Sequence, residues 1–241
     1  MNFSYEDLNI IYEDNHIIVV VKPQGIPSQA DKSGDVDMLT LIKEYLIHKY
    51  NKPGNAYVGL VHRLDRPTGG VMVFAKTSKA AERLHEALLN GEVEKSYLTV
   101  VRGVPRQKRE RLEDYLQKFE SLNIVKVVPP VTKGAKKAVL EYSVLDTKEN
   151  CSLVWVKLET GRSHQIRVQM SNIGNPLLGD AKYGEIKSRN PYPLALWSAE
   201  LKLIHPTTKE RMTFRVYPDQ EQYPFSLFDM DIYLKVTMKN N

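Results

Sequence analysis

His62-Arg63-Leu64-Asp65-Arg66-Pro67-Thr68-Gly69-Gly70 is the stretch that decides the fold and the chemistry of this 241-residue chain. Apolar runs precede and follow it, at Tyr57–Val61 and at Val71–Phe74. A polar segment with Pro and Gly between two apolar runs indicates a strand, a tight irregular turn and a second strand. This pattern places Asp65 at a strand end.

Asp65 lies between Arg63 and Arg66, and two flanking cations favour an ionised carboxylate at neutral pH. An ionised carboxylate suits a nucleophile and does not suit a general acid. The alternative interpretation of an isolated Arg-Leu-Asp-Arg sequence is a surface turn in which Asp65 caps a backbone amide. The rest of the chain has to decide between the two.

Length and composition narrow the class of protein. The chain is long enough to bury a substantial core, and no linker divides it, so we expect a single domain over residues 1–241. Its net charge of +5 and pI near 9.0 fit a polyanionic partner without requiring one. The single cysteine, Cys151, excludes disulfide frameworks and cysteine-based zinc sites and predicts a reducing, cytoplasmic location. No segment is long and apolar enough to predict membrane insertion.

The spacing of apolar residues predicts more strands than helices. One helix is expected between Asp37 and Pro53 and another from Ser78 to Gly91. Strands are expected at Ile10–Tyr12, Ile17–Val21, Tyr97–Val101, Ala138–Leu145, Leu153–Leu158, Gln165–Met170, Leu194–Leu203 and Met212–Val216. Because strands and helices do not alternate regularly, these elements predict an α+β fold on a mainly antiparallel sheet flanked by a few helices.

Two segments lack a clear pattern. Gly103–Lys137 is rich in Arg and Lys without clean periodicity, which predicts extended loops or hairpins whose charges either contact phosphates or are simply solvated. The tail from Phe225 is apolar enough for one more strand or helix against the core.

Two further motifs make the interpretation specific. Leu158–Val168 contains Thr-Gly-Arg followed by His-Gln-Ile-Arg, and Leu177–Gly184 reads Leu-Leu-Gly-Asp-Ala-Lys-Tyr-Gly. Together with His62–Gly70, they closely resemble the RluA-type pseudouridine synthases. The resemblance continues through Val21-Lys22-Pro23-Gln24-Gly25-Ile26-Pro27, Glu94-Lys95-Ser96-Tyr97 and Ile204-His205-Pro206, so it covers roughly residues 10–217.

The resemblance implies a long, bent mixed sheet with the active cleft across it, and the isomerisation of a uridine in RNA to pseudouridine. In the family the nucleophile is an Asp that matches Asp65, the active-site tyrosine matches Tyr97, and Arg162 matches the arginine that pairs with the catalytic Asp. Arg63 matches an arginine thought to fill the space left by the flipped-out uridine. The neighbours expected to bind substrate are His62, Arg66, His164, Gln165 and Arg167.

The implied reaction sets expectations for cofactors and partners. Isomerisation adds and removes no atoms, so no cofactor is expected, and six histidines without paired metal-type spacing argue against a metal site. The carboxylate can attack C1′ of the sugar or C6 of the base, or stabilise positive charge on the sugar, and these routes stay open. The expected partner is a ribosomal or transfer RNA stem-loop, bound by a monomer.

Some residues depart from the family pattern or have structural roles. Gly69 stands where the family usually has Ser, and Gln169 where it often has His. Asp180 is expected to fix its own loop by Asx-type hydrogen bonds rather than to take part in catalysis. Lys22, Pro23 and Gly25 are expected to form a rigid turn that supports the cleft.

Residues outside the resemblance leave fewer expectations. The S4-type RNA-binding domain of some relatives is not expected, because the catalytic resemblance begins almost at once. Residues 218–241 are expected to form a C-terminal extension whose role the sequence does not indicate.

Two other functions compete with this interpretation. A non-catalytic RNA-binding protein on the same scaffold would be expected to have lost Asp65, Tyr97 or Arg162, and all three are present. A nucleoside hydrolase or glycosidase would need a second carboxylate or a metal cluster near Asp65, and neither motif supplies one.

Overall fold

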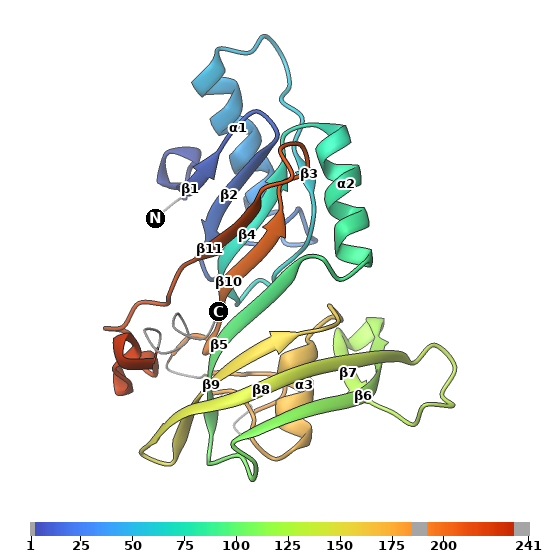
Figure 1. Ribbon diagram of the computed structural model, residues 1–241, viewed down its shortest axis with the longest axis vertical. Helices are drawn as coiled ribbons and strands as arrows, with labels where there is room; N and C mark the ends of the chain where they lie inside the picture. Colours follow the sequence, from blue (N-terminus) through green and yellow to red (C-terminus); the bar gives the residue numbers. More distant parts are fainter. Residues whose placement is uncertain (1–2, 185–191, 234–241) are drawn as a thin grey trace. The chain divides into compact units, whose positions relative to one another are not determined.

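The computed structural model describes residues 3–184 and 192–233, and the chain divides into two compact units (Figure 1). Unit 1 comprises Met1–Lys95 and Ser198–Val216, and unit 2 comprises Ser96–Trp197 and Tyr217–Asn241. Strands and helices occur in both units without regular alternation, so the predicted α+β class is confirmed. A single functional domain over residues 1–241 stays a prediction.

The core of unit 1 is a sheet with the strand order β1-β2-β4-β10. Its strands are β1 (Asn9–Glu13), β2 (Ile17–Lys22), β4 (Gly69–Ala75) and β10 (Leu196–Ile204), with β3 (Gly59–Leu60) paired to β4 and β11 (Arg211–Arg215) paired to β10. The pairings of β1 with β2, β2 with β4, β3 with β4 and β10 with β11 are antiparallel. Almost every side chain of β2 and β4 is buried, which explains why these strands read as continuous apolar runs.

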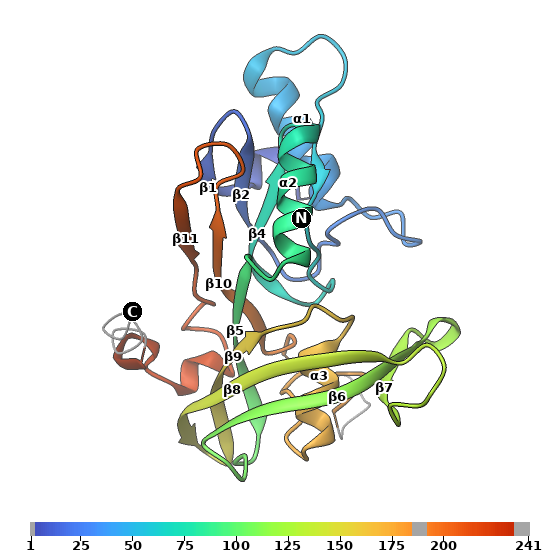
Figure 2. The same cartoon turned by 45° about the vertical axis from the view of Figure 1, so that its right-hand side comes forward.

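The two helices of unit 1 confirm the sequence prediction closely. The Asp37 carboxylate caps α1 (Met38–Tyr50) by accepting from the backbone N–H groups of Leu39 and Thr40. Thr77 caps α2 (Ser78–Leu89). Figure 2 shows α2 lying along β4, where its buried alanines and leucine complete a hydrophobic core with β2 and β4.

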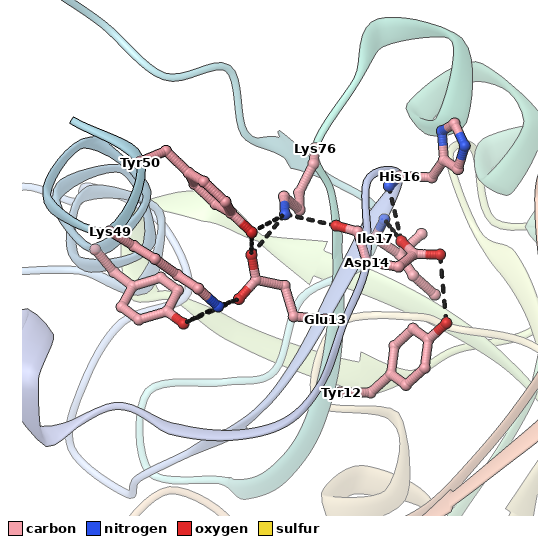
Figure 3. A network of polar contacts seen from close by, with 9 residues as sticks. Tyr12, Glu13, Asp14, His16, Ile17, Lys49, Tyr50 and Lys76 are labelled. Atoms are coloured by element: carbon pink, nitrogen blue, oxygen red, sulfur yellow. Dashed lines mark hydrogen bonds and ion pairs between the residues drawn. The ribbon is translucent and has the colours of Figure 1, made fainter. Parts of the chain in front are cut away.

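Glu13 ties α1 to the sheet of unit 1 (Figure 3). Its buried carboxylate accepts hydrogen bonds from Lys49 and Tyr45 on one oxygen and from Lys76 and Tyr50 on the other, at 2.6–2.9 Å. Burial by itself would raise the pKa of Glu13, but the hydrogen bonds from the two lysines and two tyrosines outweigh it and hold this pKa at about 2. The carboxylate is therefore ionised and fully engaged, which marks the network as structural.

Unit 2 is built on a sheet with the strand order β5-β9-β8-β6-β7. Its strands are β5 (Glu94–Arg102), β6 (Arg109–Phe119), β7 (Ile124–Val127), β8 (Lys136–Lys148) and β9 (Cys151–Leu158). The pairings of β9 with β8, β8 with β6 and β6 with β7 are antiparallel. The helix α3 (Gln165–Asn172) packs Val168 against Leu116, Val125 and Ala138 of this sheet.

The prediction of a strand at Gln165–Met170 is wrong, since these residues form most of α3. Polar and apolar residues alternate along this segment, which is typical of a half-buried strand. All six side chains are buried instead, and Gln165, Arg167 and Gln169 are buried with hydrogen-bond partners on other elements. The alternation therefore reflects buried polar side chains and not an exposed face.

Gly103–Lys137 contains a hairpin, one of the two forms predicted for it, in which β6 pairs antiparallel with β7. The 11-residue β6 is nevertheless more regular than the sequence pattern indicates. Only Leu112 and Leu116 of β6 are buried, so the strand carries little apolar signal. Its charged residues form pairs with neighbours, such as Lys137 with Glu113 at 2.6 Å. These pairs account for the charge-rich composition of the strand without any ligand.

The C-terminal segment is described only up to residue 233. Phe225–Leu227 form a 3₁₀ turn, and Phe225, Phe228 and Met230 are buried, as the apolar pattern predicts. The rest of the predicted extension, residues 234–241, lies outside the described residues. No helix in residues 3–184 or 192–233 has the length and apolar character needed to cross a bilayer.

Gly70 lies where the backbone of β4 closely approaches Ser198 of β10. Its φ of +118° suits glycine, and a Cβ atom there would overlap the backbone carbonyl and nitrogen of Ser198. By contrast, Gly91 at the end of α2 has a φ of +74°, and a Cβ atom there would meet nothing within 4 Å. Gly70 therefore needs both the absence of a side chain and a left-handed backbone.

We expect Gly70→Ala to lower the free energy of unfolding by more than about 2 kcal/mol, because the clash and the strained φ add together. The matched control, Gly91→Ala, should cost only about 1 kcal/mol for its left-handed backbone. Urea unfolding of both variants checks the difference. Equal losses would show that the contact with Ser198 is not the cause.

Candidate active site

Asp65 lies in a loop, residues 61–68, between β3 and β4, and not at a strand end as predicted. β3 ends at Leu60. Within the loop, the Ser28 hydroxyl accepts from the Leu64 N–H at 3.1 Å and donates to the Leu64 carbonyl at 2.8 Å. The Thr68 N–H then donates to the Asp65 carbonyl at 2.9 Å, which closes a turn. Asp65 as a residue is partly exposed.

The segment 22–28 braces this loop from the end of β2. The Gln24 side chain donates to the Pro67 carbonyl at 2.8 Å, and the Gly25 N–H donates to the Arg66 carbonyl at 2.9 Å. With Ser28 on Leu64, these bonds fix the backbone on both sides of Asp65. The sequence prediction of a supporting turn at this place agrees with these contacts.

Lys22 makes the most deeply buried of these contacts. It is fully buried, and its Nζ donates to the carbonyls of Pro23 at 2.9 Å and Arg66 at 3.1 Å. Burial, together with the positive charge of Arg66, lowers the pKa of Lys22 to about 7. The nearby Asp65 carboxylate acts in the opposite direction, because it favours the charged form of Lys22. The sequence signal for this residue is a lysine that ends an apolar strand directly before a proline.

The two arginines beside Asp65 have different surroundings. The Arg66 guanidinium forms ion pairs with Asp35 at 2.7 Å and Asp31 at 3.3 Å, so it stabilises the exposed 31–35 loop. The sequence analysis instead expects Arg66 to bind substrate. Arg63 is exposed and forms no hydrogen bond or ion pair with any residue in the part of the chain that the structure describes. Arg63 therefore remains available for a ligand.

His62 carries a neutral ring. Its Nε2 accepts from the Val73 N–H at 3.2 Å, so the ring proton lies on Nδ1. Burial, reinforced by the charge of Lys95, lowers the pKa of His62 to about 3. A contact between His62 and RNA would therefore use a neutral N–H donor.

In unit 2, the buried Gln165 side chain fixes the Thr160-Gly161-Arg162 turn. Its Oε1 accepts from the Arg162 N–H at 3.0 Å and the Thr160 hydroxyl at 2.8 Å, while its Nε2 donates to the Val139 carbonyl at 3.0 Å. The Arg162 side chain is exposed, and its Nε donates to the Lys137 carbonyl at 2.9 Å. Gln165 thus positions the backbone of Arg162, whereas the sequence analysis expects Gln165 to bind substrate.

Arg167 is also engaged in an ion pair within the protein. Its Nε and Nη2 form a bidentate ion pair with Asp180 at 2.7 and 2.8 Å, and both side chains are buried. Asp180 additionally accepts from the N–H groups of Lys182 and Tyr183, which is the Asx-type bonding that the sequence predicts. His164 is the N-cap residue of α3, with a φ of 52°, and its Nδ1 lies 2.6 Å from the Tyr183 hydroxyl.

Tyr97 lies on β5 and is 6% exposed. The predicted site residues fall into two groups: His62, Arg63, Asp65 and Arg66 share the 61–68 loop of unit 1, whereas Tyr97, Arg162, His164, Gln165 and Arg167 belong to unit 2. Among the described residues no group of His, Cys, Asp and Glu could hold a metal ion.

Lys22→Met gives a test of the buried ammonium. The pKa of Lys22 is near 7 in the folded chain and 10.5 in the unfolded chain, so between these values the unfolded chain binds the extra proton. The free energy of unfolding of the wild type should therefore rise from pH 7 to pH 9, relative to Lys22→Met, with a slope of up to about 1.4 kcal/mol per pH unit. Urea unfolding at both pH values measures it, and parallel profiles would contradict the prediction.

Arg167→Met should lower the free energy of unfolding by about 3–5 kcal/mol, because it leaves Asp180 buried without its cation. Urea unfolding measures the loss. The double variant Arg167→Met with Asp180→Asn should recover part of it, since no charge is then buried. A variant of normal stability with weakened RNA binding would instead assign Arg167 to the substrate.

Three comparisons identify the relatives of this chain. Residues 16–172 match the family model described as RNA pseudouridylate synthase. The chain is 37% identical over 211 residues to YjbO of Bacillus subtilis (strain 168), named as an uncharacterized RNA pseudouridine synthase, across 86% of this chain and 71% of the relative. It is 33% identical over 246 residues to the ribosomal large subunit pseudouridine synthase D of Zymomonas mobilis, across 97% and 74% of the two chains.

A solved structure, human RNA pseudouridylate synthase domain containing 1, shares the fold with a TM-score of 0.75 at 23% identity, and the match covers 100% of this chain and 98% of that one. The family model and the relatives agree with the motifs around Asp65 and Arg162. The chain therefore belongs to the RluA-type RNA pseudouridine synthases, and it is an isomerase that acts on RNA.

Proposed function

We propose that this synthase converts a specific uridine of structured ribosomal or transfer RNA to pseudouridine, with Asp65 as the nucleophile on a flipped-out base. The main support is the 61–68 loop, whose backbone is braced by Lys22, Gln24 and Ser28 and in which Asp65 is a partly exposed residue. A rigid backbone suits a carboxylate that must attack one atom of a large substrate.

The reaction makes limited demands on the protein. The bond between N1 of uracil and C1′ of ribose breaks, the base turns, and a bond between C5 and C1′ forms. C5 loses its proton and N1 gains one, so the product is an isomer of uridine. One carboxylate suffices, acting at C1′ or at C6, and no electron is gained or lost. The released uracil must stay in a site closed to water until the new bond forms.

The other predicted residues have matching properties. We assign Arg162 to pair with the catalytic carboxylate, since its turn is fixed by Gln165 and its side chain is exposed. Tyr97 is assigned to the uracil ring and to proton transfer at the sugar. The exposed cation of Arg63 suits the space that a flipped-out uridine leaves in the RNA.

The RNA pool is a further part of the proposal. A relative named ribosomal large subunit pseudouridine synthase D matches 97% of this chain, so large-subunit ribosomal RNA is the first pool to test, followed by transfer RNA. We assign a stem-loop within that RNA as the target and a monomer in the cytoplasm as the active form. The single cysteine agrees with that reducing compartment.

Tritium release from RNA labelled at C5 of uridine tests the proposal, because the label leaves only when C5 bonds to the sugar. We expect release by the wild type and a loss of at least about 10³-fold in kcat for Asp65→Asn, with RNA binding retained. The control is Asp231→Asn, an exposed carboxylate, which should retain wild-type activity.

The outcomes separate the alternatives. Release by Asp65→Asn at the wild-type rate would remove Asp65 from the chemistry. RNA binding without release from any RNA pool would favour the non-catalytic RNA-binding protein.

A further inference from the structure

Lys95 is a cation without a partner among the described residues. It is partly buried at the start of β5, and burial lowers its pKa, yet no carboxylate or carbonyl oxygen in residues 3–184 or 192–233 contacts its ammonium group. Lys22 and Lys76, which are also withdrawn from water in unit 1, both have oxygen partners. A desolvated ammonium without an acceptor attracts an anion that can enter the site.

His62 provides a second donor close to Lys95. Val61, which precedes His62, Val73, whose N–H binds His62, and Val93, two residues before Lys95, pack in one hydrophobic core. The Lys95 charge accordingly lowers the pKa of His62. The His62 Nδ1 atom is buried and has no hydrogen-bond partner among the described residues, and it carries the ring proton because Nε2 accepts from Val73. An ammonium group and a neutral N–H therefore lie near each other in unit 1, and neither has an acceptor in the part of the chain that the structure describes.

The positions of these residues in the chain indicate which anion would bind. His62 directly precedes Arg63 in the loop that carries Asp65, and Lys95 comes two residues before Tyr97. RNA brings one phosphate for every nucleotide, and its phosphates are bound by lysine side chains and by neutral N–H donors.

We propose that Lys95 and His62 form a binding site for a backbone phosphate of the RNA beside the target uridine, which rests on the function proposed above. The ammonium group compensates the phosphate charge, and the His62 Nδ1–H donates to a phosphate oxygen. Since His62 stays neutral at physiological pH, the site adds a single positive charge.

Lys95→Met tests the charge. The affinity for a short fluorescein-labelled oligouridylate is measured over a range of salt concentrations by the wild type and the variant. Loss of one phosphate contact should reduce the slope of log K against log[salt] by about 0.7, which weakens binding by about fourfold at ~0.15 M salt. Lys95→Arg should restore the slope, and the exposed Lys79→Met serves as the matched control that leaves it unchanged.

His62→Gln tests the neutral donor. The glutamine Oε1 can accept from the Val73 N–H in place of Nε2, whereas the Nδ1–H donor is lost. We expect weaker oligouridylate binding with an unchanged salt slope, because no charge is removed.

Stability distinguishes binding from a structural role. Removing a desolvated, unpaired ammonium should leave the free energy of unfolding of Lys95→Met equal to or above that of the wild type. An unchanged salt slope for Lys95→Met, or a loss of stability that accounts for the weaker binding, would overturn the phosphate site.

The test is independent of the proposed chemistry. Tritium release with an unchanged slope would keep the synthase function and reject the phosphate site. A reduced slope without tritium release from any RNA pool would keep the phosphate site and reject the proposed reaction.

Discussion

The hydrogen bonds from the buried amine of Lys22 to the Pro23 and Arg66 carbonyls are the interaction on which the Asp65 loop depends. The register of β2 and β4 places Lys22 opposite Gly70, the residue at which β4 approaches Ser198 too closely for any side chain. From there Lys22 reaches the Arg66 carbonyl, next to Asp65 in the chain. This position desolvates the lysine, as its pKa near 7 reflects, and the desolvation is offset by two carbonyl acceptors and by the nearby carboxylate of Asp65.

The cations of the chain divide into those that the protein satisfies itself and those that it leaves available. Arg66 and Arg167 are bound by aspartates, and the same arrangement holds Lys76 on Glu13. Arg63 and Lys95 have no such acceptor among the described residues, and each is within two residues in sequence of a residue proposed for catalysis. A net charge of +5 is therefore a weak indicator of RNA binding, because charges already paired within the protein contribute little to it.

The predictions that agree with the structure and those that do not have a common physical basis. The helices after Asp37 and Thr77 are predictable because local capping and an apolar stripe determine them. The α3 segment is not, because its buried Gln165 and Arg167 are satisfied by distant partners, Val139 and Asp180. A local pattern treats a buried polar residue as exposed, so it predicts a strand where the chain forms a helix.

The sequence by itself determined the α+β class, the family and the candidate residues Asp65, Tyr97 and Arg162, because ordered motifs and local periodicity are written along the chain. Only the tertiary structure decided which polar and charged residues of these motifs bind the protein and which are left for a ligand. It engaged Arg66, Gln165 and Arg167 with other protein groups and left Arg63 and Lys95 without partners among the described residues. The reason is that hydrogen bonding and desolvation depend on neighbours that are distant in sequence, which no local pattern records.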